Sequence, residues 1–168
     1  MNSKRIVAVI SVVVLLIILV YPALASGSLS ISLKSTSIPK ADHVLLTIKD
    51  VWAHRAGQGQ DQGWELVYNT TVTVDLKSLV TSPNMIKGNA PVAAYDTVRV
   101  DISNVTWVFN GTSSNLQIES NQLTSSLDFA VQSSQNVPLI IVIAGRSDVL
   151  EGQRFFAATL NATIANGS

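Results

Sequence analysis

The sequence of 168 residues contains no cysteine. This absence excludes disulfides, thiolate zinc sites, iron–sulfur clusters, cysteine nucleophiles and an acylated lipoprotein anchor. Charge is also scarce, since only 13% of the residues are charged and the eleven basic and eleven acidic side chains cancel. A nucleic-acid-binding domain carries a basic face, so this balance argues against a nucleic-acid partner. Sustained helical periodicity is missing after residue 25, which leaves strands as the expected structure.

One long apolar run is present, at the N-terminus. Lys4-Arg5 precedes residues 6–20, and Ala23-Leu24-Ala25 then places small residues at the −3 and −1 positions of a cleavage site before Ser26. Fifteen helical residues span about 22 Å, less than the ~30 Å hydrocarbon core of a membrane. We therefore expect a signal peptide cleaved between Ala25 and Ser26.

A retained membrane anchor, spanning residues 6–25, is the alternative for residues 1–25, because the longer segment reaches the required length. In both cases the basic end stays inside, and residues 26–168 lie outside the cytoplasm, secreted or at the cell surface.

Alternation of apolar and polar residues recurs through residues 26–168, in segments of about four to thirteen residues. About nine or ten short strands with turns between them, and no long helix, predict a single antiparallel β-sandwich of Greek-key type. The apolar positions fall in the following segments: 29–33, 44–55, 64–68, 72–74, 98–102, 105–109, 116–118, 127–131, 139–144 and 156–164.

Breaks in this alternation predict the local irregularities. A change of parity near Lys49-Asp50 indicates a β-bulge. Residues 57–63 are expected to form a hairpin loop, residues 75–79 one helical turn and residues 81–91 a loop. Asn110-Gly111 is a hairpin turn signal.

Three blocks of sequence occur in a characteristic order: Gly27–Leu33 followed by Val44–Val51 with His54, then Gly63–Leu66 leading to Val74–Leu79, and then Ala94–Val100. Together they resemble the domain of unknown function 4382, a family of exported bacterial and archaeal β-domains. The resemblance covers residues 27–144 and implies fold and location, because no activity is established for the family.

Two segments depart from the family pattern. Ser35–Pro39 stands where the family tends to have an Asp-Ala-Pro turn, and Ile140–Ile143 stands where it often has acidic residues. An acidic ligand or calcium site is therefore not carried over to this chain.

Asn-x-Thr sequons predict N-glycosylation at Asn69, Asn104, Asn110 and Asn161. Trp107 lies on the apolar face of its strand, so Asn104 and Asn110, of opposite parity, are expected to point outward. Asn161 is likewise out of phase with its apolar neighbours, and Asn69 begins a turn. Solvent-facing positions are those that a bulky glycan requires.

The two histidines offer little catalytic or metal chemistry. His54 follows Asp50 by four residues on one strand face, and His43 follows Asp42, but a third ligand is missing. We therefore expect structural histidines, no metal, no cofactor and no enzyme. No Gly-x-Ser-x-Gly elbow is present.

These features together predict an exported, N-glycosylated domain, of archaeal type, with a structural or interaction role and a protein or glycan partner. A carbohydrate-binding module is one alternative, favoured if Trp64 lies exposed beside a groove. The other is a self-assembling filament subunit, in which the strand at residues 29–33 completes the sheet of a second copy.

Overall fold

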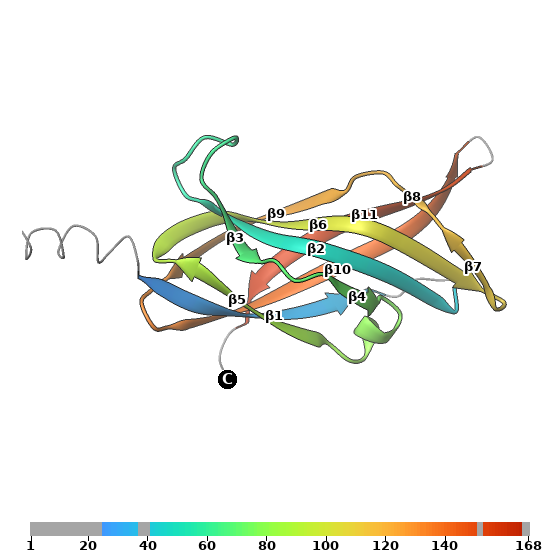
Figure 1. Cartoon of the computed structure of the whole chain (residues 1–168), viewed down its shortest axis with the longest axis horizontal. Coiled ribbons are helices and arrows are strands. Elements are labelled where there is room, and N and C mark those ends of the chain that lie inside the picture. The colour runs from blue at the N-terminus through green and yellow to red at the C-terminus, as the bar shows by residue number, and fades with distance from the viewer. Residues whose placement is uncertain (1–24, 37–40, 151–152, 166–168) are drawn as a thin grey trace, which may run out of the picture.

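The computed structural model describes residues 25–36, 41–150 and 153–165, and the predicted signal or anchor segment through residue 24 lies outside them. In the described residues, eleven strands form two sheets that pack around one apolar core (Figure 1). The all-β, two-layer prediction is therefore confirmed.

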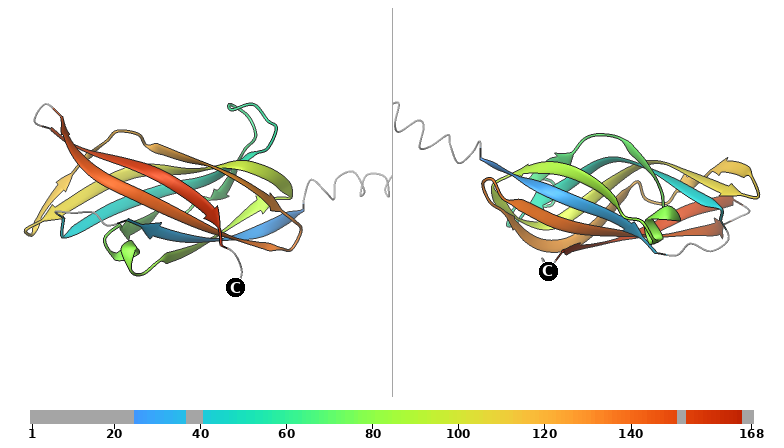
Figure 2. Two further views of the ribbon diagram at one scale, coloured as in Figure 1. Left: turned by 180° about the vertical axis from the view of Figure 1, so that it is seen from behind. Right: turned by 90° about the horizontal axis from the view of Figure 1, so that it is seen from below.

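The first sheet has the strand order β5-β1-β10-β11-β8 (Figure 2). Its strands are β1 (Ser26–Ser35), β5 (Asn84–Pro91), β8 (Gln117–Ile118), β10 (Asn136–Leu150) and β11 (Gln153–Ile164).

The second sheet has the order β3-β2-β6-β7, with β4 paired to β2 and β9 paired to β6. Its strands are β2 (His43–Arg55), β3 (Trp64–Tyr68), β4 (Val72–Asp75), β6 (Ala93–Phe109), β7 (Thr112–Asn115) and β9 (Gln122–Val131). One short 3-10 turn, Ser78–Val80, lies slightly later than the helical turn predicted at residues 75–79.

The prediction of a purely antiparallel sandwich of short strands is wrong. β1 runs parallel to β10, β8 runs parallel to β11, and β6 is a single strand of 17 residues. Alternation indicates which side chains share a face, but it carries no information on the direction of the neighbouring strand.

Alternating side chains build the core as the sequence pattern predicts. On β1, Leu29, Ile31 and Leu33 are at most 1% exposed, while the serines between them are half-buried. The predicted β-bulge also forms, because the pairing of β2 with β6 shifts register between Ile48 and Asp50.

The segment at residues 81–91 is not a loop throughout, because Asn84–Pro91 form β5 at the edge of the first sheet. β5 buries only Ile86, Gly88 and Ala90. Two of its three inward positions are small, so the segment lacked the large apolar alternation that indicates a strand.

Candidate functional site

An open groove of about 820 Å³ crosses the outer face of the second sheet, beside the loop of residues 57–63 that connects β2 to β3 and projects from the sheet in Figure 1. We call it the Trp64 groove. Polar side chains dominate its lining: His54, Gln58, Gln60, Asp61, Trp64, Asp96, Thr97, Arg99, Gln122, Thr124, Ser126 and Asp128.

Strand register places these side chains in rows across four strands. One row contains Trp64, His54, Thr97 and Ser126, in the strand order β3-β2-β6-β9. Residues opposite one another on neighbouring strands project to the same face, so the four side chains share one outer surface.

The next row places the side chain of Arg99 between two aromatic rings. Its guanidinium carbon lies 5.1 Å from the ring centroid of Trp52 and 4.6 Å from that of Trp64. Both distances are within the range of cation–π attraction. Arg99 Nε also lies 3.0 Å from Asp101 Oδ1, a close ion pair whose geometry is not that of a hydrogen bond.

Asp101 also forms a hydrogen bond with Trp52. Its Oδ2 accepts a hydrogen bond from the indole Nε1 of Trp52 at 2.9 Å. Asp101 therefore positions both Trp52 and Arg99, and it does so from the rigid β6 strand.

Trp64 stands at the edge of the groove, where the sheet meets the loop. Its indole Nε1 donates a hydrogen bond of 2.8 Å to the backbone oxygen of Gln60, and its ring lies 5.0 Å from that of His54. The ring is half-buried. Trp64 thus lies beside a groove, as the carbohydrate-binding alternative requires, although it is half-buried and not fully exposed.

His54 is buried beneath the loop and uses both ring nitrogens. Nδ1 lies 2.8 Å from Asp96 Oδ1, and Nε2 lies 3.1 Å from the backbone oxygen of Gly59. A carboxylate and a carbonyl both accept, so both hydrogen bonds require the doubly protonated imidazolium. The hydrogen bond to Gly59, and then that to Asp96, raise the pKa of His54 above 6.5.

The partner of His54 differs from the one that its strand face suggests, because His54 contacts Asp96 and not Asp50. His43 Nδ1 contacts Asp75 Oδ2 at 2.8 Å. Adjacent strands bring residues together that are 32 and 42 positions apart, and this proximity outweighs nearness along the chain. Among the described residues, no group of three or more His, Asp or Glu side chains is arranged to hold a metal ion.

The four predicted glycosylation residues are all exposed: Asn69, Asn104, Asn110 and Asn161. Trp107 is 3% exposed, which confirms the face assignment for its strand. Asn110 departs from strand alternation, because it has φ 48° in the turn and lines a second pocket together with Trp107.

The residues that sequence reasoning missed are Asp96, Arg99 and Asp101. A signal for two of them was present, because Thr97, Arg99 and Asp101 alternate with buried valines on one strand. This alternation indicates that Arg99 and Asp101 lie together on the outer face of the strand. Only the register of the neighbouring strands places Trp52 and Trp64 beside them.

These features define the class of protein as a two-sheet β-domain with an aromatic and polar groove on one outer face. The family described as "Domain of unknown function (DUF4382)" matches residues 26–151. The chain belongs to this family, so the resemblance inferred from the sequence is confirmed. No curated protein and no solved structure matches the chain.

The described part of the chain has no helix that is long and apolar enough to cross a membrane.

Proposed function

We propose that this protein is an exported, extracytoplasmic domain that acts by binding, and that the Trp64 groove binds carbohydrate. The observation that carries the proposal is the pair of Trp64 and Arg99 in an open groove lined by hydrogen-bonding side chains, with Trp52 beside Arg99. Strands supply most of this surface, and rigid elements position a binding site better than loops do.

The chemistry of the groove suits a sugar. A pyranose ring has apolar C–H patches, which pack on the surface of an indole, and hydroxyls that both donate and accept hydrogen bonds. Amide and hydroxyl side chains in the groove can form these hydrogen bonds with the sugar hydroxyls, and they belong to Gln58, Gln60, Gln122, Thr97, Thr124 and Ser126.

The charges in the groove favour an uncharged sugar. Asp61, Asp96 and Asp128 bring carboxylates to the lining, while Arg99 and, when its ring is protonated, His54 bring positive charge. These charges nearly cancel, so neither an acidic nor a basic saccharide gains a net attraction.

Catalysis is not part of the proposal. Both nitrogens of His54 are engaged in hydrogen bonds, with Asp96 and with the Gly59 carbonyl, and neither is bonded to a nearby hydroxyl such as that of Ser126.

Export rests on the N-terminal sequence and is compatible with the position of β1. β1 begins at Ser26, so cleavage before that residue leaves every residue of the strand in place. We expect N-terminal sequencing and intact mass of native material to give Ser26 as the first residue. Retention of Lys4 would instead establish the anchor alternative.

A glycan microarray followed by calorimetry on the mature protein tests the groove. We expect a neutral oligosaccharide to bind, Trp64→Ala to weaken its binding about two- to tenfold, and Trp64→Phe to retain part of the affinity, because aromatic contact carries about 0.5–1.5 kcal/mol. Met85→Ala is the matched control, since Met85 is 60% exposed on β5, outside the groove. A folded protein that binds no glycan, or equal affinities for all three variants, would contradict the proposal.

A further inference from the structure

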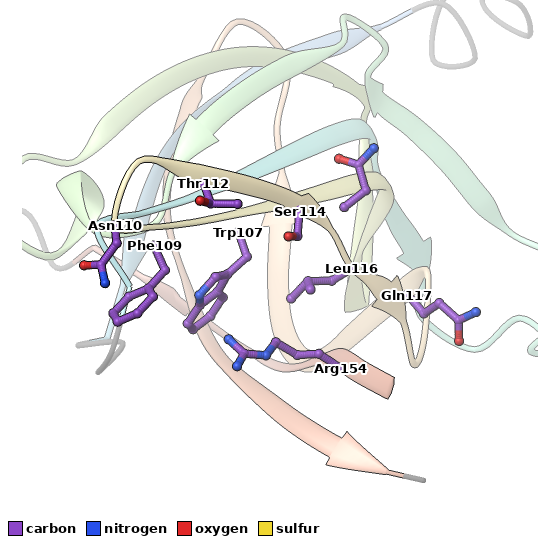
Figure 3. A pocket seen from close by; sticks show the side chains of 9 residues that line it. Trp107, Phe109, Asn110, Thr112, Ser114, Leu116, Gln117 and Arg154 are labelled. Carbon is purple, nitrogen blue, oxygen red and sulfur yellow. The ribbon is translucent and has the colours of Figure 1, made fainter. Parts of the chain in front are cut away.

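A second pocket, of about 670 Å³, lies where the β6–β7 hairpin meets β11 (Figure 3). Trp107, Phe109, Asn110, Thr112, Leu116 and Arg154 are among its lining residues. Figure 3 shows the side chains of Asn110, Phe109, Trp107 and Arg154 following one another along one side of the pocket. None of these residues lines the Trp64 groove.

The hairpin turn brings the sequon to the end of this row. Phe109 pairs with Thr112 across the hairpin, and the two residues between them have positive φ, 48° at Asn110 and 73° at Gly111. This is the conformation of a type I′ turn, which Asn-Gly favours. The turn sets the Asn110 amide beside the Phe109 ring in Figure 3, and Asn110 is the acceptor residue of Asn110-Gly111-Thr112.

The pocket leaves one large aromatic side chain uncovered. Phe109 is 47% exposed, although it continues the apolar face of β6. Arg154 is an exposed hydrogen-bond donor at the same pocket, whereas the indole Nε1 of Trp107 is buried.

We propose that the glycan attached to Asn110 folds back into this pocket, with its first sugar packed on Phe109 and the following sugars lying toward Trp107 and Arg154. The inference rests on the exported state in the proposed function, and it concerns a different surface from the Trp64 groove.

A carbohydrate covers what the pocket leaves exposed. Its C–H patches cover the exposed ring of Phe109, and its hydroxyls are acceptors for the guanidinium of Arg154. The Arg154 guanidinium carbon lies 5.7 Å from the Trp107 ring centroid, so the end of the row is a donor placed beside an aromatic surface.

The sequon at Asn161 lacks these features and serves as an internal comparison. Asn161 is exposed in the middle of β11, opposite Val142 of β10, and it does not line the pocket. A glycan at Asn161 therefore extends into solvent, whereas one at Asn110 gains contacts with the protein.

The experiment compares matched sequon variants of the full chain, expressed in a host that exports and N-glycosylates it. Thr112→Val removes the sequon but keeps Asn110 and its turn, and Thr112→Ser retains the sequon. Thr163→Val and Thr163→Ser make the same changes at Asn161, since Thr163 is also an exposed strand residue. Glycopeptide mass spectrometry gives the occupancy, and thermal unfolding gives Tm.

We expect Asn110 to be occupied and Thr112→Val to lower Tm by roughly 2–5 °C, with Thr163→Val lowering it by less than half as much. In a Phe109→Ala background the effect of Thr112→Val should shrink to less than half, because the first sugar has lost its aromatic contact. The same variants from a host without N-glycosylation should differ little in Tm, which separates the glycan from the threonine side chain.

An unoccupied Asn110, or equal Tm losses for Thr112→Val and Thr163→Val, would overturn the inference. So would a Thr112→Val effect of undiminished size in the Phe109→Ala background. Oligosaccharide binding in the Trp64 groove is measured on the same preparations with Trp64→Ala, so a failure here is distinguishable from a failure of the proposed function.

Discussion

The imidazole Nδ1 of His54 lies 2.8 Å from Oδ1 of Asp96, a residue 42 positions further along the chain. The opposite nitrogen of the ring is bonded to the backbone oxygen of Gly59, in the loop beside the Trp64 groove. His54 thus ties the loop to two strands through one ring, and both bonds form only while the ring is protonated.

The loop is therefore expected to loosen as the pH rises. The pKa of His54 is raised, so the stabilisation from its charged form is complete below its ordinary value of 6.5 and is lost as the pH rises through the folded-state pKa. The hydrogen bond from His54 lowers the pKa of Asp96, so the contribution of this carboxylate is lost only as the pH falls through a value below 3.8. We expect the protection of loop amides such as Gln62 from hydrogen exchange, relative to the intrinsic exchange rate at each pH, to decrease as His54 deprotonates.

Asp96→Asn tests the cause of this pH dependence. Removing the carboxylate should lower the pKa of His54, and the loss of protection from hydrogen exchange should then begin at lower pH. Asp42→Asn is the control, because Asp42 lies outside the pair and its replacement should leave the pKa of His54 and the exchange of the loop unchanged. The measurement is an NMR titration of the His54 ring. A His54 pKa below 6.5 in the unmodified protein would contradict the double hydrogen bond.

Gly88→Ala is expected to destabilise the fold by about 1–3 kcal/mol, as overpacking of a core does. A Cβ at Gly88 would lie 2.5 Å from the backbone oxygen of Val67 and 2.6 Å from its Cγ1, so β5 and β3 would have to separate. Gly59→Ala is the control, because nothing lies within 4 Å of its added Cβ. Urea unfolding of both variants measures this loss of stability. Equal urea midpoints for the two variants would show that β5 moves away from β3 at no cost in stability.

The same glycine explains why β5 was not found in the sequence. Its inward positions include Gly88, which is small because Val67 of β3 lies against it, and this requirement comes from the opposing strand. Strands with large alternating side chains, such as β1, were readable because hydrophobic burial alone determines their pattern. The Asn110-Gly111 turn was readable for a local reason as well, since positive φ limits the choice of residues.

The candidate groove was only partly predictable, because its residues meet through strand register. Trp64 could be singled out as an aromatic residue beside a glycine loop. The position of Arg99 between Trp52 and Trp64 requires three strands to be aligned, and β-bulges in β2 and β6 shift that alignment by single residues. Alternation fixes the face of a residue but leaves its cross-strand neighbours open.

Arg99→Lys is expected to weaken oligosaccharide binding several-fold while changing the stability by less than about 1 kcal/mol. The planar guanidinium stacks between Trp52 and Trp64, and an ammonium group lacks that geometry. Arg154→Lys, at the second pocket, is the matched control. Calorimetry gives the affinity, and near-ultraviolet circular dichroism reports the indole packing. Unchanged affinity for Arg99→Lys would place the ligand away from this cluster.

The last prediction concerns β1 and separates an intrinsic strand from the donor strand of a filament. β1 has partners on both edges, with Ile31 opposite Ile86 of β5 and opposite Leu139 of β10. Its three inward side chains, Leu29, Ile31 and Leu33, are almost fully buried in the core of the same chain.

Truncation of the mature chain to Lys34 should therefore leave it unfolded. Each lost side chain is worth roughly 1.5–3 kcal/mol when fully buried, and the three together approach the ~5–15 kcal/mol that stabilises a typical domain. Ile31→Val, which costs only about 0.5–1.5 kcal/mol, should stay folded and report the same strand with a smaller loss of stability. We expect the untruncated mature chain to sediment as a monomer at high concentration, because β1 completes its own sheet. A truncated chain that is soluble, and that assembles only when a peptide of residues 26–33 is added, would instead establish the filament.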